Sequence, residues 1–468
     1  MDFVSWRHLD APPFTIESLL QRIAALEPTV ATLHDENRQL REENRSLREQ
    51  LGQQRRTSAR QAAPFRRRDS KKVPKDQHKR PGRKLGHPGT NRPVPEHIDQ
   101  EIEQPLDGCP KCGGPVSEGH PVEQFIEEIP PVRPRVIRLV TWEGHCPNCG
   151  EVHSTHPLQT SRARHAAKVQ LGPRALAIGT ALNKHFGLSM RRTCQVLGKL
   201  FGLTLSPGGL SQATDRIADR LTDKYYALLA DIRGAPATFA DETSWWVGEK
   251  GWWLWVFTTP NETVFHVDKS RASAVVQKIL GEDYAGVLVS DCLASYNPIA
   301  CRKHKCIAHH LRAIAEAKEL PGHADSAYLN QWTLLFKVVI ILHRLAVEGK
   351  LAAATLIERR VHVERWIDRL LDMPVERGGE ARIRNRLRKQ RPHLMGCLDD
   401  VSAEPTNNRA ERALRPAVIA RKISCGNKTV RGRRTWQVLA SLAATCVQRG
   451  EDVIDYLTKQ LLCPAGCE

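Results

Sequence analysis

The segment GVLVSD, residues 286–291, is a short run of apolar and β-branched residues that ends in an acid. Such a run is typical of a buried strand, here with Asp291 at its carboxyl end. A second segment, ATFADET at residues 237–243, predicts a strand that ends in the acidic pair Asp241 and Glu242. Two strands are therefore expected to carry an aspartate at the point where each one ends.

The residues between these strands indicate the fold class. GWWLWVFTTP (251–260) and TVFHVDKS (263–270) are strand-like and are separated by a turn, and RASAVVQKIL (271–280) has the apolar spacing of an amphipathic helix. Three strands, a helix and a fourth strand are the order in which a ribonuclease-H-like fold begins. In that fold the first and fourth strands are neighbours, so an α/β catalytic domain with Asp241 beside Asp291 is expected.

A third acid is expected on a helix near the end of the chain. TNNRAERALRP, residues 406–416, predicts a short capped helix that carries Glu411 and stops at Pro416. Phosphodiester cleavage can use two divalent ions, and carboxylates are the oxygen ligands that hold them. We therefore predict that Asp241, Asp291 and Glu411 bind Mg²⁺ or Mn²⁺, with Asp241 shared between two ions.

Each acid also has a simpler interpretation. An aspartate after a strand commonly caps a turn or helix, and Glu411 beside Arg412 could form a surface ion pair. Glu242 and Glu404 are the competing acids. Glu242 should point off the opposite face of its strand, and Glu404 precedes a proline outside the helix. The three acids together, in this fold order, favour catalysis over chance.

Two C-x-x-C pairs predict a structural zinc site. Cys109 and Cys112 are separated from Cys146 and Cys149 by 33 residues, and four thiolates on two such turns complete a tetrahedral Zn²⁺ shell. The apolar and β-branched residues 125–142 would form the strands of a zinc ribbon. Structural thiols are the alternative. The odd total of thirteen cysteines fits metal binding in a reducing cytoplasm better than disulfides.

Leucines at every seventh position predict a coiled coil near the start of the chain. Asparagines at two of the intervening core positions favour a parallel, two-stranded pairing of two chains. Pro28 interrupts the pattern, so its strongest part is residues 29–52, and a helix that packs on its own chain is the alternative. The repeating leucines are Leu19, Leu26, Leu33, Leu40 and Leu47.

Basic residues give the chain a formal charge of +18, and most of the excess is concentrated. Residues 53–94 hold fourteen Lys and Arg against two Asp, a local net charge of +12. Such a segment predicts a polyanionic partner, with a solvated tail as the alternative. Within it, KRPGRKLGHPG is compact enough to follow a phosphate backbone or enter a minor groove through Arg80, Arg83 and Lys84.

Two further regions carry candidate DNA contacts. The pattern predicts a helix over about 189–200 and another from 206, in helix–turn–helix order with Arg191 and Arg192 on the first. A plain helical packing module fits equally well. Nine basic residues between positions 409 and 434 surround the third acid and are expected to hold DNA phosphates, with a solvated face as the alternative. Those assigned to DNA are Arg412, Arg415, Arg421 and Lys422.

Taken in order, these segments resemble one known family. DET at 241–243, the GVLVSD strand, CIAHHLR at 306–312 and NNRAERALRP at 407–416 resemble the insertion sequence 66 family of DDE transposases. The basic linker, the paired C-x-x-C turns and the leucine-zipper start resemble it too, so the likeness covers nearly the whole chain. Thr406 departs from the family, whose members often carry Asp there.

The resemblance implies a catalytic triad of Asp241, Asp291 and Glu411. It also implies DNA cleavage at transposon ends, followed by strand transfer by the exposed 3′-hydroxyl. Cys306 and His309 form a C-x-x-H pair that recurs in several DDE families, and we expect this pair to brace the site through a hydrogen bond rather than to bind a metal.

The expected protein is a cytoplasmic transposase that binds double-stranded DNA as a homodimer or larger assembly, with accessory transposition proteins as further partners. No apolar run approaches the roughly 18–20 residues that span a bilayer. A transposase-derived DNA-binding regulator without activity and a structure-specific nuclease of the same fold are the alternatives. The expected parts are a coiled coil (15–52), a basic linker (53–95), a zinc-binding ribbon (96–160), a helix–turn–helix-like region (161–232) and a catalytic domain (233–462) with a helical insertion at about 313–400.

Overall fold

The computed structural model describes residues 28, 35–43, 92–118, 120–161, 169–375 and 378–462. The chain forms two compact units, Met1–Phe125 and Ile126–Glu468. In the first unit, residues 35–43 are helical, and residues 92–118 form no helix or strand. Most of the predicted coiled coil lies outside the described residues, as does the linker segment with Arg80, Arg83 and Lys84.

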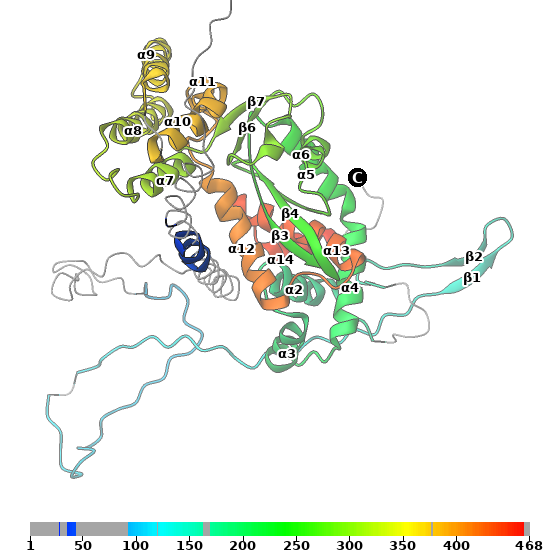
Figure 1. The fold of residues 1–468 in the computed structure, drawn as a ribbon. Helices are drawn as coiled ribbons and strands as arrows, with labels where there is room; N and C mark the ends of the chain where they lie inside the picture. The colour runs from blue at the N-terminus through cyan, green and yellow to red at the C-terminus, as the bar shows by residue number, and fades with distance from the viewer. Residues whose placement is uncertain are drawn as a thin grey trace, which may run out of the picture. The chain divides into compact units, whose positions relative to one another are not determined.

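The second unit is built around a five-stranded sheet with the order β5-β4-β3-β6-β7 (Figure 1). β3, β4 and β5 are antiparallel, whereas β6 and β7 run parallel to β3. The predicted order of three strands, a helix and a fourth strand is confirmed. The strands are β3 (Ala237–Val247), β4 (Glu249–Thr258), β5 (Thr263–Asp268), β6 (Val287–Ser290) and β7 (Arg302–Lys305).

The prediction that the first strand ends at its acidic pair was wrong. β3 continues beyond Asp241 to Val247, because β4 pairs with it along this whole length. Only the pairing with β6 stops early, at Phe239. Asp241 therefore lies in the middle of a strand, at the point where the parallel neighbour ends.

Most of the helices pack on the two faces of this sheet, and a group between β7 and α12 forms a separate insertion. The predicted pair at 189–200 and from 206 is confirmed as α3 and α4, with Ser189 and Ser206 accepting the capping hydrogen bonds. The helices outside the insertion are α2 (Pro173–Lys184), α3 (Met190–Phe201), α4 (Pro207–Arg220), α5 (Thr222–Gly234), α6 (Ser273–Leu280), α12 (Asn408–Ser424), α13 (Val430–Gln448) and α14 (Val453–Leu462).

Alternate residues of each strand enter different cores, as the pleat requires. On one face, Ala240 and Leu288 pack with apolar residues of α2, α4, α5, α6, α13 and α14. On the other face, Phe239 and Val289 pack with α12 and with part of α13. Odd-numbered residues of β3 and β6 therefore face α12, which fixes the direction of the side chains that follow.

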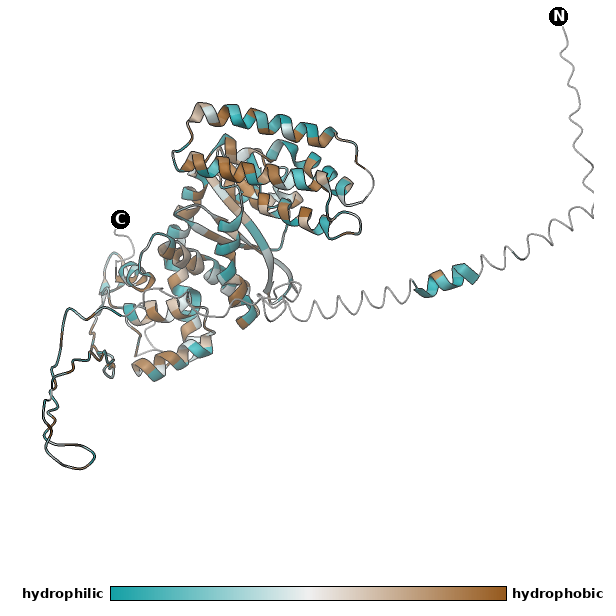
Figure 2. Ribbon diagram, turned by 90° about the vertical axis from the view of Figure 1, so that its left-hand side faces the viewer, coloured by the Kyte–Doolittle hydropathy of each residue, from teal (hydrophilic) through white to brown (hydrophobic). Residues whose placement is uncertain are grey.

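The insertion has its own core. Trp332, Phe336 and Ile367 are fully buried in it, and Figure 2 shows hydrophobic and hydrophilic residues mixed along its helices. None of the described helices combines the length and apolarity that crossing a bilayer requires. The insertion consists of α7 (Ile307–Lys318), α8 (Ala327–Val347), α9 (Ala353–Asp372), α10 (Gly379–Gln390) and α11 (Gly396–Asp399).

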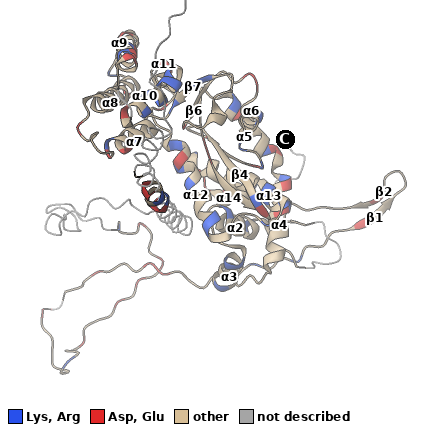
Figure 3. Cartoon of the chain, viewed as in Figure 1, with Lys and Arg blue, Asp and Glu red and all other residues tan. Residues whose placement is uncertain are grey.

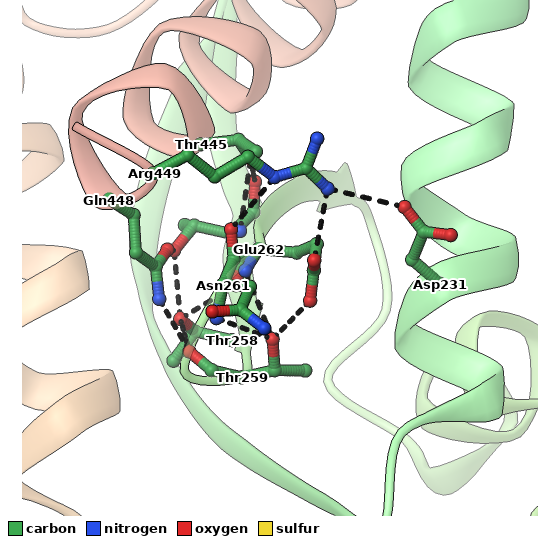
Figure 4. A network of polar contacts seen from close by, with 9 residues as sticks. Asp231, Thr258, Thr259, Asn261, Glu262, Thr445, Gln448 and Arg449 are labelled. Atoms are coloured by element: carbon green, nitrogen blue, oxygen red, sulfur yellow. Dashed lines mark hydrogen bonds and ion pairs between the residues drawn. The ribbon is translucent and has the colours of Figure 1, made fainter. Parts of the chain in front are cut away.

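The turn between β4 and β5 is fastened to the last turn of α13 (Figure 4). Arg449, directly after α13, pairs with Glu262 at 2.9 Å and with Asp231 of α5 at 3.4 Å. The Thr263 hydroxyl donates to Gln448 at 2.7 Å, and the Thr263 N–H donates to the Thr445 hydroxyl at 3.1 Å. These bonds hold the edge of the sheet opposite β7.

The ribbon strands predicted over residues 125–142 do not form. Those residues contain no strand, and their apolar side chains are exposed, Val136 by 92%. Three prolines between 130 and 134 remove hydrogen-bond donors that a strand would need. A shorter hairpin forms instead around the second C-x-x-C turn, from β1 (Glu143–Cys146) and β2 (Gly150–His153).

Candidate active site

Strand register brings two of the predicted acids together. β3 and β6 pair in parallel, Ala237 with Val287 and Phe239 with Val289. The same offset of fifty residues, continued two positions past the last pair, brings Asp241 opposite Asp291, which directly follows β6. Neighbouring strands lie about 4.8 Å apart, and residues in register point to the same face. Both carboxylates therefore lie on the face that α12 covers.

Helix α12 presents Glu411 in its first turn. The helix packs on β3 through buried Ala410 and Leu414. The side-chain amide of Asn407, fully buried, donates to the Ala240 carbonyl at 2.8 Å. Asn407 occupies the capping position but makes no side-chain cap; it ties the start of α12 to the strand residue before Asp241 instead.

The prediction that this helix stops at Pro416 was wrong. α12 continues to Ser424 with the proline inside it. Proline removes one backbone hydrogen bond from a helix interior. Leu414 and Ala417, on either side of Pro416, are buried against the sheet, and this packing offsets the lost bond.

Burial and mutual repulsion act on the acids. Burial raises the pKa of Asp241 to about 7, and the adjacent Glu242 carboxylate adds to the rise. The charges of Asp291 and Glu411 raise this pKa further, so the three carboxylates lie within electrostatic reach of one another. One Asp291 oxygen also accepts the Leu293 N–H at 2.8 Å, which is the turn-capping role that the simpler interpretation assigned to it.

The C-x-x-H pair joins the elements that carry the acids. The Cys306 N–H donates to the Ser290 carbonyl at 2.9 Å, and the Asn407 N–H donates to the Cys306 sulfur at 3.1 Å. His309 Nε2 lies 3.8 Å from a Glu411 oxygen. Cys306 thus links the end of β6 to the start of α12, and His309 lies against the third acid.

Lys305 is a site residue that sequence reasoning missed. Its side chain is fully buried, and Nζ donates to the Ser290 hydroxyl at 3.0 Å and to the Asp291 carbonyl at 2.9 Å. Nζ also lies 5.4 Å from the centre of the Tyr296 ring. Burial lowers the pKa of Lys305 to about 8. The polar sequence RKHK of β7 has no apolar alternation, so no pattern signalled a buried strand there.

The competing acids are engaged elsewhere. The Glu242 side chain points to the opposite face of β3, as predicted. It pairs with Arg271 at 2.7 Å and accepts a hydrogen bond from the Tyr296 hydroxyl at 2.6 Å. Glu404 accepts from Arg409 Nε at 2.9 Å. Neither acid joins the face on which Asp241 lies.

The basic residues near the end of the chain divide into two groups. Arg421 is half-buried and donates to the Thr243 and Ser244 hydroxyls, so it holds α12 to β3. Arg412 and Arg415 are exposed on α12 and pair with no acid among the described residues. Lys422 of α12 and Arg191 and Arg192 of α3 are exposed as well, and Figure 3 shows basic residues on both helices.

The donor chemistry of the three acids suits a hard divalent cation, because carboxylate oxygens are what Mg²⁺ binds. Within the described residues, no three His, Cys, Asp or Glu side chains lie close enough together to hold one metal ion. Burial is the main cause of the raised pKa of Asp241, and the neighbouring carboxylates add to it, so a divalent cation at this position would offset both.

In each C-x-x-C turn, the pKa of the first cysteine is lowered. Backbone N–H groups of Lys111 and Cys112 lower the pKa of Cys109, and those of Asn148 and Cys149 do the same for Cys146. Cys109 and Cys112 belong to the first unit, and Cys146 and Cys149 to the second. The four-thiolate zinc site stays a prediction.

Two uncharacterized proteins of one bacterium are similar to this chain over most of its length. The uncharacterized protein y4jD of Sinorhizobium fredii is 25% identical over 407 residues, which cover 79% of this chain and 77% of that protein. The uncharacterized protein y4hP of the same organism is 25% identical over 403 residues, 76% of this chain and 70% of its own.

A family model described as "Transposase IS66 family" matches residues 168–435. This range is more than half of the chain, and it contains the sheet, the insertion and the three acids on the α12 face. The chain therefore belongs to the IS66 family of transposases.

Proposed function

We propose that this transposase cleaves and joins DNA at an active site formed by Asp241, Asp291 and Glu411, in a ribonuclease-H-like catalytic domain. One observation carries the proposal. The β3–β6 register, continued past its last pair, supports a position of Asp241 beside Asp291, and the Asn407 bond to Ala240 holds the start of the helix that bears Glu411 against β3.

Divalent ions held by these carboxylates would activate the attacking water or 3′-hydroxyl and neutralise charge on the leaving oxygen. The side chains prepare the site. Asp241 must lose its proton to act as a ligand, and its pKa of about 7 allows this at neutral pH. Lys305 holds the backbone of Asp291, and Cys306 holds the backbone at the start of α12. Arg412 and Arg415 supply charge for DNA phosphates on the exposed side of α12.

The remaining parts would serve DNA end binding and assembly. Arg191 and Arg192 of α3 would contact DNA in a helix–turn–helix arrangement with α4. The four cysteines would hold Zn²⁺, and the leucine repeat would pair two chains so that two element ends are held together. The basic linker would add affinity along the phosphate backbone.

A strand-nicking assay tests the catalytic assignment. The full chain is incubated with Mg²⁺ and duplexes that carry the ends of its element, and Asp291→Asn is compared with wild type. We expect the substitution to abolish nicking because it removes a charged ligand. Glu404→Gln is the matched control, since it removes a carboxylate of the same region from outside the site, and it should retain activity.

The products distinguish the neighbouring functions. Joined products identify a transposase, cut products without joining identify a nuclease, and binding without either identifies a DNA-binding regulator. Nicking that persists in Asp291→Asn contradicts the triad.

A further inference from the structure

A layer of buried polar side chains lies on the face of the sheet opposite α12. Tyr296, Lys305 and Ser290 are fully buried there. The Glu242 side chain is 3% exposed and belongs to the same layer. Most of this face packs in an apolar core. The polar layer is therefore a local exception, and it lies behind the part of β3 that carries Asp241.

Glu242 is the centre of this layer. Its carboxylate accepts a hydrogen bond from the Tyr296 hydroxyl at 2.6 Å and pairs with Arg271 at 2.7 Å. The centre of the Tyr296 ring lies 5.4 Å from Lys305 Nζ, and the same Nζ donates to the Asp291 carbonyl at 2.9 Å. The layer thus connects β3 to the backbone of Asp291.

Strand pairing alone does not fix the distance between the two aspartates. The register of β3 with β6 ends at Phe239 and Val289, two residues before each acid. Tyr296 lies five residues after Asp291, at the end of a short 3-10 turn, and its hydroxyl reaches back to β3. This hydrogen bond joins the turn after Asp291 to the strand of Asp241, beyond the last residues that the strands pair.

The net stability of the fold does not explain a buried carboxylate at this position. Desolvation of Glu242 opposes the attraction to its partners, and apolar replacements of buried ion pairs are often neutral or stabilising. Groups that form hydrogen bonds behind metal ligands orient those ligands, and their loss commonly weakens metal binding about 10–100-fold. The place of Glu242, next to Asp241 and bonded to the turn that follows Asp291, suits this second role.

We propose that Glu242 and Tyr296 are positioning residues of the active site. Their hydrogen bond sets the separation of the Asp241 and Asp291 carboxylates from the opposite face of the sheet. The inference rests on the proposed function and deepens it, because it assigns a role to the acid that competes with Asp241 in the sequence. Glu242 and Tyr296 bind neither metal nor DNA; each acts through the backbone that it shares with one aspartate.

The test compares Tyr296→Phe with Tyr284→Phe in the full chain. Tyr284 is the matched control, because its buried hydroxyl donates to Thr238 at 2.9 Å, near the other end of β3. Each variant loses one buried hydrogen bond from the same core and keeps its ring. Mn²⁺ binding without DNA is measured from the paramagnetic resonance signal of the free ion, and thermal unfolding is measured in EDTA.

We expect both variants to lower the melting temperature by a similar amount. Only Tyr296→Phe should raise the dissociation constant for Mn²⁺, by about tenfold, whereas Tyr284→Phe should keep the wild-type value. Glu242→Ala removes the acceptor and should weaken Mn²⁺ binding as Tyr296→Phe does. Glu242→Gln keeps an oxygen that accepts the Tyr296 hydroxyl, so it should bind Mn²⁺ more tightly than Glu242→Ala.

Equal dissociation constants for Mn²⁺ in Tyr296→Phe and Tyr284→Phe overturn the inference. Equal weakening by Glu242→Gln and Glu242→Ala overturns it as well, because the effect would then come from the charge of Glu242 and not from its hydrogen bond. Asp291→Asn judges the proposed function in the same assay. Mn²⁺ binding that is unchanged in Asp291→Asn contradicts the triad itself, whereas loss of binding there with equal tyrosine variants contradicts the positioning role alone.

Discussion

Asp241 is the residue at which burial and charge conflict most directly. Its pKa of about 7 means that the folded protein holds a proton there that the unfolded chain releases near pH 4. The stability from this proton is fully present below pH 4 and is lost as the pH rises to about 7. Above pH 7 the metal-free protein carries the full cost of a buried carboxylate.

The variant Asp241→Asn should therefore stabilise the metal-free protein while it abolishes nicking. The difference in unfolding free energy between variant and wild type should grow from about pH 4 to about pH 7. Above pH 7 it should stay constant, at about 2–4 kcal/mol. Thermal or urea unfolding at pH 5 and pH 8 in EDTA measures it. A variant less stable than wild type at pH 8 would count against a charged, desolvated Asp241.

Mg²⁺ binding should release a proton below pH 7, because the ligand must be ionised. The apparent affinity should fall by up to about tenfold per pH unit below pH 7. Calorimetry in two buffers of different ionisation enthalpy measures the proton released per ion bound. Binding at pH 6 without proton release would contradict the pKa assigned to Asp241.

At the scale of elements, tertiary packing determined where α12 ends and that β7 is a strand, and the local sequence predicted neither. Pro416 predicted a helix end, yet α12 continues through it because Leu414 and Ala417 are buried against the sheet. Polar β7 gave no strand signal, although Lys305 lies fully buried within it. The strands and helices with clear apolar periods, such as β6 and α4, were predictable from sequence alone.

The same scale gives a test of how Glu411 is held. Asn407→Ala removes the bond to the Ala240 carbonyl and should cost about 1–3 kcal/mol of unfolding free energy. The nicking rate should fall by more than about tenfold, because a small displacement of a catalytic group lowers the rate of the chemical step strongly. Asn408→Ala is the control, since that neighbour is exposed. Equal effects of the two variants would contradict the anchoring role.

For the whole molecule, sequence predicted that the first and fourth strands of the sheet are neighbours, but not how every part is arranged. The observed offset of fifty residues between β3 and β6 extends from these strands toward Asp241 and Asp291, and strand order alone does not determine this offset. The apolar residues 125–142 predicted the strands of a zinc ribbon, but these residues form no strand. Their prolines lack the N–H groups that strand pairing needs, and their apolar side chains are exposed. Lys305 reaches the backbone of Asp291 from β7, and only the tertiary fold reveals this contact.

The zinc site is tested at this scale as well. The purified full chain should contain about one Zn²⁺ per chain, held by four thiolates. Replacing Cys146 and Cys149 with serine should release the metal, as measured by elemental analysis. Cys425→Ser is the control, because Cys425 is exposed and outside both C-x-x-C turns. Full zinc content after loss of Cys146 and Cys149 would exclude the four-cysteine site.

The most direct test of the account is anomalous diffraction from crystals of the full chain soaked in Mn²⁺, which replaces Mg²⁺ at oxygen sites. We predict anomalous density between the carboxylates of Asp241, Asp291 and Glu411, and its loss in crystals of Asp291→Asn. Mn²⁺ bound away from these three side chains, or unchanged density in the variant, would contradict the proposed active site.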